Sequence, residues 1–169
     1  MEKVPIALTL NGREREVWIW PYKMLLHVLR DELGATEVKY GCGEGVCSTC
    51  AVLVDGRSVN SCLMLAVQAR GREVTTVKGL AQDERLHPLQ ESFLRHGASQ
   101  CGFCTPGMLT IAYEFLAEHP RPSRDEIRQA LAGNLCRCTG YTKIVDAIEA
   151  FAAAEPEAGS ASPAGGRSG

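Results

Sequence analysis

Eight cysteines constrain this chain of 169 residues more than any other feature, because they form two separate groups of four with none left over. The first group has the spacing C-x4-C-x2-C followed by a more distant fourth cysteine, and consists of Cys42, Cys47, Cys50 and Cys62. The second group is two close pairs, Cys101 with Cys104 and Cys136 with Cys138. Sets of four thiolates are typical of zinc sites and iron–sulfur clusters. The spacing therefore predicts two metal centres.

Length and charge limit the classes of protein that fit. A chain of this length forms one or two domains, and one quartet in each half favours two small ones. Small domains bury little apolar surface, so a bound metal centre would add to the folding free energy of each. The formal net charge is −2, and no run of like charge stands out. Composition thus gives no electrostatic reason to expect nucleic acid or a membrane as partner.

The cysteines could instead form four disulfides, as in a small secreted protein. However, residues 1–12 carry no apolar signal core, no twin arginine and no cleavage site. Apolar stretches elsewhere are much shorter than a membrane span. A reducing cytosol keeps thiols free, which favours metal binding. We therefore expect a cytoplasmic chain whose cysteines bind metal.

The first half has the pattern of a β-grasp, ferredoxin-like domain over residues 1–79. Apolar residues alternate over 4–10 and 17–19 on either side of Asn11-Gly12, which predicts a hairpin with a type I′ turn. Pro21 is expected to open a helix that ends at Gly34. Further elements are expected as follows: a tight hairpin over 51–60 with an Asp55-Gly56 turn, a last strand over 73–77, and a helix face formed by Leu25, Val28, Leu29 and Leu33.

The second half changes to helical periodicity and predicts a four-helix bundle over residues 80–153. The first expected helix is 88–95. The second is 108–118, preceded by an N-cap and N1 pair at Thr105 and Pro106. The third runs from a capping box at 123–126 to Gly133-Asn134, and the fourth covers about 141–153. Residues 154–169, rich in Ala, Gly, Ser and Pro, are expected to be disordered. The predicted fold class is therefore α+β, a β-grasp domain followed by a helical domain.

The first quartet has the plant-type [2Fe–2S] spacing. Its loop places glycines at 41, 43 and 45 between the cysteines, which allows a short loop to turn its amides toward cluster sulfides. Zinc sites more often use C-x2-C pairs, so the x4 gap favours [2Fe–2S] over zinc. The three glycines resemble a phosphate-binding loop, but they follow a predicted helix and open none, so we reject a dinucleotide site.

The second quartet is more ambiguous from spacing alone. Its two pairs fit a zinc site, and C-x-x-C is also the thioredoxin redox motif. The pair lies among helices, which weakens the thioredoxin interpretation. Each pair also precedes a predicted helix N-terminus, which would stabilise the negative charge of a cluster and favours it over zinc. The histidines, namely His27, His87, His96 and His119, lie on or beside predicted helices and are expected to be packing or surface residues rather than ligands.

Two segments resemble a known family. They are Gln100-Cys101-Gly102-Phe103-Cys104-Thr105-Pro106-Gly107-Met108 and Gly133-Asn134-Leu135-Cys136-Arg137-Cys138-Thr139-Gly140-Tyr141. With Val59-Asn60-Ser61-Cys62-Leu63 around the first quartet, they resemble the iron–sulfur subunit of the molybdenum hydroxylases, of the xanthine dehydrogenase, aldehyde oxidoreductase and carbon monoxide dehydrogenase type. The resemblance covers roughly residues 3–153 and implies two [2Fe–2S] clusters.

The resemblance also implies a function. Substrate would be hydroxylated at a molybdopterin cofactor on a large subunit, and electrons would pass through this chain toward an FAD-binding medium subunit or another acceptor. The second quartet would lie next to the molybdopterin and the first nearer the flavin. Gln100 and Cys138 match family residues that contact the pterin. The family usually has glycine at Ser48, and a hydroxyl there could raise the cluster potential through a hydrogen bond to sulfur.

We therefore predict the electron-transfer subunit of a molybdenum-containing oxidoreductase, with no substrate site on this chain and a hetero-oligomeric assembly. The alternatives are a free-standing two-cluster ferredoxin and a zinc-stabilised interaction module.

Overall fold

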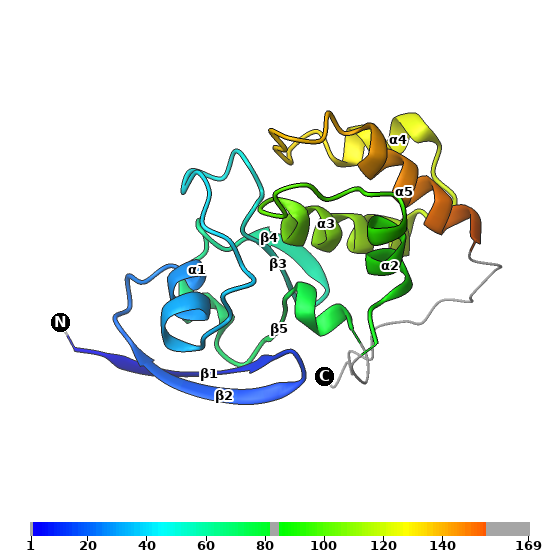
Figure 1. Ribbon diagram of the computed structural model, residues 1–169. Helices are drawn as coiled ribbons and strands as arrows, with labels where there is room; N and C mark the ends of the chain where they lie inside the picture. Colours follow the sequence, from blue (N-terminus) through cyan, green and yellow to red (C-terminus); the bar gives the residue numbers. More distant parts are fainter. Residues whose placement is uncertain (1, 82–84, 155–169) are drawn as a thin grey trace.

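The computed structural model describes residues 2–81 and 85–154. Within these residues the chain forms two lobes, a five-stranded sheet packed with short helical turns and a separate group of helices (Figure 1). The order of strands in the sheet is β2-β1-β5-β3-β4. No helix of the described residues is long and apolar enough to cross a membrane.

The N-terminal hairpin is confirmed. Strands β1 (Val4–Leu10) and β2 (Arg13–Ile19) pair antiparallel, with Leu10 opposite Arg13. Asn11 and Gly12 both have positive φ, at 50° and 75°, as the predicted type I′ turn requires. One face of β1 carries buried Ile6, Leu8 and Leu10 into the core.

The helix after the hairpin is shorter than expected. It starts at Leu25, as α1 (Leu25–His27), and continues as a π-helical turn η1 (Val28–Glu32). The predicted start at Pro21 is wrong, because the chain first makes a turn in which the Lys23 amide donates to the Trp20 carbonyl. Gly34, with φ 70°, follows the helix as predicted. The buried residues of this segment are Leu25, Leu26, Val28 and Leu29.

The second hairpin is formed by β3 (Ala51–Val54) and β4 (Arg57–Asn60), again with a positive-φ turn at Asp55-Gly56. A short 3-10 helix, η2 (Ala66–Ala69), leads to β5 (Glu73–Thr75), which pairs parallel to β1 and antiparallel to β3. This is the β-grasp arrangement.

Strand β5 ends two residues before the predicted end at Val77. Val77 begins a 3-10 helix, η3 (Val77–Leu80), instead. Its side chain packs against the core of the helical lobe, and its carbonyl accepts a hydrogen bond of 2.8 Å from the Gln90 side chain. Val77 thus makes its contacts with the helical lobe instead of continuing the strand.

The helical lobe consists of α2 (Pro88–Arg95), α3 (Thr105–Glu118), α4 (Arg124–Ala130) and α5 (Thr142–Ala154). The Ser123 capping box of α4 is confirmed, because the hydroxyl accepts from the Glu126 amide and the Glu126 carboxylate accepts from the Ser123 amide. Two bounds were predicted wrongly. The N-cap of α3 is Cys104, not Thr105, and α4 ends at Ala130, before Gly133.

Each lobe has its own hydrophobic core. The first core joins buried residues between Ile6 and Val74, and the second joins buried residues between Leu89 and Ala152. The predicted α+β class, a β-grasp domain followed by a helical domain, is confirmed. Ala154, predicted to be disordered, is the last residue of α5, and the rest of that prediction, 155–169, lies outside the described residues.

Candidate metal centres

The second hairpin positions half of the first quartet. Cys50 directly precedes β3, and Cys62 lies two residues after β4. Pairing of Ala51 with Asn60 therefore holds these two cysteines at the same end of the hairpin. The buried Ser61 hydroxyl donates to the Cys50 carbonyl at 2.7 Å and closes this end.

The other half comes from the glycine-rich loop before β3. Gly43 and Gly45 have positive φ, at 73° and 77°, and a Cβ at Gly45 would lie 2.3 Å from the Leu63 side chain. The turn at Gly43 points the Glu44 amide at the Cys42 sulfur, which accepts at 3.3 Å. This is the inward-facing amide that the glycines were predicted to allow.

Ser48 adopts φ 50° in the same loop. This left-handed conformation costs a residue with a Cβ about 1–2 kcal/mol and is the natural place for glycine. It explains in physical terms why glycine is expected there. Ser48 is buried, and its hydroxyl lies 3.9 Å from where a Cβ on Gly133 would stand, so this side chain faces the helical lobe.

The second quartet lies at the starts of two helices. Cys104 is the N-cap of α3, and the Cys136–Cys138 pair lies in the loop that leads into α5. Cys101 and Cys138, both exposed, place their sulfurs 3.5 Å apart. The predicted proximity of both pairs to helix N-termini is thus observed.

Tyr141 organises the loop around Cys136, a role that the sequence reasoning missed. Its hydroxyl accepts from the Cys136 amide at 2.8 Å and donates to the Asn134 carbonyl at 2.9 Å. The Thr139 hydroxyl lies 3.0 Å from the Cys136 sulfur. Both residues belong to the Thr139-Gly140-Tyr141 run that followed the cysteines in sequence, which was the available signal.

Hydrogen bonding and burial shift the pKa values of two thiols in the first quartet in opposite directions. A hydrogen bond from the Glu44 amide, opposed by burial, lowers the pKa of the Cys42 thiol to about 6. Burial, reinforced by the neighbouring Cys50 thiol, raises the pKa of Cys62 to about 11. In the absence of a cation it is therefore unfavourable for all four thiols to be deprotonated at once. A bound metal would favour the thiolate forms by neutralising their negative charge.

The second quartet behaves in the same way. Burial, with a contribution from Cys136, raises the pKa of Cys104 to about 12. Burial also opposes ionisation of Cys136, but hydrogen bonds from Thr139 outweigh it and lower the pKa of that thiol. The pKa of Cys138 is raised, first by its contact with Cys101.

These interactions test whether the residues fit a metal centre. Among residues 2–81 and 85–154, no three His, Cys, Asp or Glu side chains converge on a point that could hold a single metal ion. The donor chemistry fits an iron–sulfur cluster, because the soft donors in each half are thiols and amides or hydroxyls point at two of the sulfurs. The Cys101 and Cys138 sulfurs lie in contact at 3.5 Å, and the neighbouring thiols that shift the pKa values of Cys42, Cys62 and Cys104 lie within the same quartet. The assignment of four thiolates to each cluster stays a prediction.

The two ligand loops touch each other. The Leu135 amide donates to the Cys47 carbonyl at 3.1 Å, so a residue of the first quartet contacts the neighbour of Cys136. Figure 1 shows the loop of residues 41–50, in cyan, beside the loop that precedes α5. Gly107 in the first turn of α3 lies against the Ser48 carbonyl, where a Cβ would come within 2.2 Å.

Gln100 and the histidines are separate from the buried part of these sites. Gln100 is exposed and next to Cys101. His27 packs against the Tyr40 ring, His96 contacts the Ser92 carbonyl, and His119 packs against Phe115. His87 is the N-cap of α2 and accepts from the Leu89 amide.

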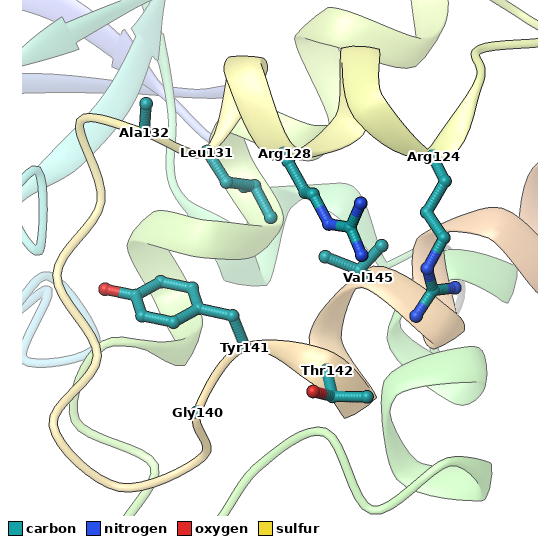
Figure 2. A pocket seen from close by; sticks show the side chains of 8 residues that line it. All are labelled: Arg124, Arg128, Leu131, Ala132, Gly140, Tyr141, Thr142 and Val145. Carbon is teal, nitrogen blue, oxygen red and sulfur yellow. The ribbon is translucent and has the colours of Figure 1, made fainter.

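A pocket of about 320 Å³ lies between α4 and the start of α5 (Figure 2). None of its lining residues is a cysteine. Arg124 at its rim is paired with Asp146 and Glu149, and Arg128 with Asp125. Figure 2 shows the Tyr141 ring pointing toward the loop of the second quartet and away from these arginines.

Two family models match the chain. Residues 8–81 match the 2Fe-2S iron-sulfur cluster binding domain, and residues 76–149 match the [2Fe-2S] binding domain. The protein is therefore of the class that carries two [2Fe–2S] clusters, one in each lobe, and the zinc alternative is not favoured.

Individual relatives narrow the class. The chain is 47% identical over 148 residues to the nicotinate dehydrogenase small FeS subunit of Eubacterium barkeri, covering 88% of this chain and 94% of that one. It is 48% identical over 147 residues to the nicotine 6-hydroxylase small subunit of Paenarthrobacter nicotinovorans, covering 87% and 88%. The crystal structure of quinoline 2-oxidoreductase from Pseudomonas putida 86 superposes with a TM-score of 0.88 at 51% identity, covering 91% and 96%. The chain belongs to the family of iron–sulfur subunits of the molybdenum hydroxylases.

Proposed function

We propose that this chain relays electrons within a larger oxidoreductase, from a molybdopterin-binding large subunit toward an FAD-binding subunit or another acceptor. The observation that carries this proposal is the hydrogen bond from the Leu135 amide to the Cys47 carbonyl, which joins the two ligand loops directly. When bound, the clusters would supply one-electron chemistry on either side of this link. The chain itself holds the two thiol sets in fixed proximity.

The proposal assigns four thiolates to each cluster. Cys42, Cys47, Cys50 and Cys62 would hold the first, and Cys101, Cys104, Cys136 and Cys138 the second. Three features support the assignment: all eight thiols are free, those of each set interact with one another, and the Glu44 amide and Thr139 hydroxyl point at sulfurs.

The surface around the second quartet supports its assignment to the molybdopterin side. Cys101 and Cys138 are exposed, and the apolar side chains of Phe103 and Leu135 beside them are 48% and 54% exposed. A partner subunit that covers this face would remove apolar surface from water. We propose that Gln100 and Cys138 contact the molybdopterin held by that subunit, and that the first quartet faces the flavin side.

The domain division is part of the proposal. We propose a first domain of residues 1–79 and a second of 80–153; the two cores support this division except at Val77, which packs against the second core, and the two family models overlap at 76–81. The proposed cytoplasmic location is supported by the need for eight reduced thiols.

The test is anaerobic purification of the full chain, metal analysis and EPR during stepwise dithionite reduction. We expect about four iron atoms per chain and two distinguishable [2Fe–2S] signals. Zinc in place of iron, or a single cluster, would overturn the proposal. Co-purification with a molybdopterin-containing chain separates the relay from a free-standing ferredoxin, since a diffusible carrier would elute alone.

A further inference from the structure

A carboxylate of α3 covers the exposed edge of the β-sheet. Strand β4 is the last strand of the sheet, so one side of it has no neighbouring strand within residues 2–81 and 85–154. The Ser58 amide of this strand donates to the Glu114 carboxylate at 3.0 Å. The Glu114 side chain is only 18% exposed. A carboxylate that is largely shielded from solvent accepts a stronger hydrogen bond than a neutral acceptor or a fully solvated carboxylate.

The same helix is held at its other end. Gly107 in the first turn of α3 lies directly against the Ser48 carbonyl, with no room for a Cβ. Helix α3 contacts the N-terminal lobe at Gly107, which lies on Ser48, and at Glu114, which accepts from Ser58. Between its ends the helix also packs along β3 and β4 (Figure 1).

Cysteines flank both of these elements. Helix α3 starts directly after Cys104, and the β3–β4 hairpin lies between Cys50 and Cys62. Loss of the contact at Glu114 would remove a partly buried hydrogen bond between α3 and β4 and would let the helix shift along the sheet on which it packs. Such a shift would move Cys104 relative to the hairpin cysteines.

We propose that Glu114 is a positioning residue that sets the separation of the two thiol sets by fastening α3 to β4. The inference rests on the proposed function, since the separation has a consequence only if both sets hold clusters. Arg57 adds ion pairs to Glu114 and Glu118, but the Arg57 side chain is 69% exposed, and such exposed pairs contribute little. The hydrogen bond to Ser58 is therefore the polar contact through which Glu114 would position α3.

The test compares three variants of the full chain loaded with iron and sulfide. Glu114→Ala removes the acceptor. Glu114→Gln keeps an acceptor oxygen without the charge. Glu118→Ala is the matched control, because it removes only the exposed ion pair of the same arginine. The readout is the magnetic interaction between the two reduced clusters, seen as splitting of their EPR signals, with iron content and melting temperature measured in parallel.

In Glu114→Ala we expect the splitting of the EPR signals to become smaller or their lines to broaden. In Glu114→Gln and Glu118→Ala we expect the splitting to equal that of the wild type. A lower melting temperature with unchanged splitting would mean a structural role only and would overturn the inference. If Glu114→Ala does not retain both clusters, Glu114→Asp decides, since a carboxylate one methylene shorter does not reach the Ser58 amide from the same helix position and should change the splitting. A wild-type chain without two clusters would instead refute the proposed function.

Discussion

Replacing Gly107 with alanine tests how closely the two lobes are packed. In an ordinary helix this change is stabilising, because alanine has the higher helix propensity. Here the new Cβ would lie 2.2 Å from the Ser48 carbonyl oxygen, 3.1 Å from the Thr49 Cα and 3.2 Å from the Ser48 carbonyl carbon. All three atoms are backbone, so no side-chain rotation can relieve the contact.

The two effects differ in size. Helix propensity favours alanine by about 0.5–1 kcal/mol. A carbon and a carbonyl oxygen approach no closer than about 3.3 Å, so α3 would have to move by about 1 Å. Overpacking of this kind costs about 1–3 kcal/mol, and more where the backbone must shift. We therefore expect Gly107→Ala to lower the free energy of unfolding by about 1–2 kcal/mol net, a measurable part of the ~5–15 kcal/mol typical of a domain.

Urea unfolding of the cluster-loaded chain, followed by circular dichroism and by loss of the visible iron–sulfur absorption, measures this difference. Gly133→Ala is the control, because its Cβ would lie 3.9 Å from the nearest atom, the Ser48 hydroxyl, which is an ordinary contact. The control should unfold close to the wild-type midpoint. A Gly107→Ala chain as stable as the wild type, or more stable, would show that α3 is not pressed against Ser48.

Three further changes have defined outcomes. Ser48→Gly should raise the free energy of unfolding in urea by up to about 1 kcal/mol, because a φ of 50° is unfavourable for serine. The greater conformational freedom of glycine in the unfolded chain offsets part of this gain. A loss of stability would mean that the Ser48 hydroxyl has a binding role. Tyr141→Phe removes the bridge between Cys136 and Asn134 and should cost about 1–2 kcal/mol, with faster loss of iron from the second cluster only; equal loss from both clusters would contradict the assignment. Ser123→Ala should cost about 1 kcal/mol of stability at pH 7. Hydrogen bonds from Ser123 lower the pKa of Glu126 from 4.5, so the contribution of this pair is present above that pH and disappears as the pH falls through the lowered value. The variant should therefore show a weaker acid dependence in melting experiments, and an unchanged dependence would exclude the capping box as its source.

Two local signals were reliable, whereas the predicted caps at Thr105 and Gly133 were wrong. The Asn11-Gly12 turn and the Ser123 capping box formed as predicted because the hydrogen bonds and φ angles that they need lie within a few residues. Pro21 misled for the opposite reason. The Leu25 amide donates to the carbonyl of Met64, far along the chain, and Met24 forms a bridge with Leu65. Tertiary pairing thus holds Met24 in an extended conformation that no local pattern indicates.

The candidate sites divide in the same way. The cysteine spacing predicted two metal centres, and the two family models confirm two [2Fe–2S] domains, while the assignment of individual thiols stays a prediction. Contacts between the lobes had no signal of their own. From the sequence alone, Gly107 is an ordinary glycine after a proline and Glu114 is an ordinary solvated helix residue. Their roles become visible only when α3 is seen to lie beside β4. Val77 was assigned to a strand for the same reason, because its packing partner belongs to the other lobe.

Stability and relay geometry therefore depend on different residues of this chain. Each lobe is stabilised by its own core, and truncation of a buried core residue such as Phe93 should cost about 3–5 kcal/mol while it leaves the contacts between the lobes in place. The lobes are held together by other contacts: Leu135 to Cys47, Glu114 to Ser58, Gly107 against Ser48, and the packing of α3 along β3 and of Val77 against the helical core. These contacts bear on how far apart the two thiol sets lie. A Phe93→Ala chain should accordingly unfold earlier with unchanged cluster–cluster splitting, whereas Glu114→Ala should change the splitting with a smaller loss of stability. If both variants altered both properties to the same degree, the two lobes would form one cooperative unit and this division would fail.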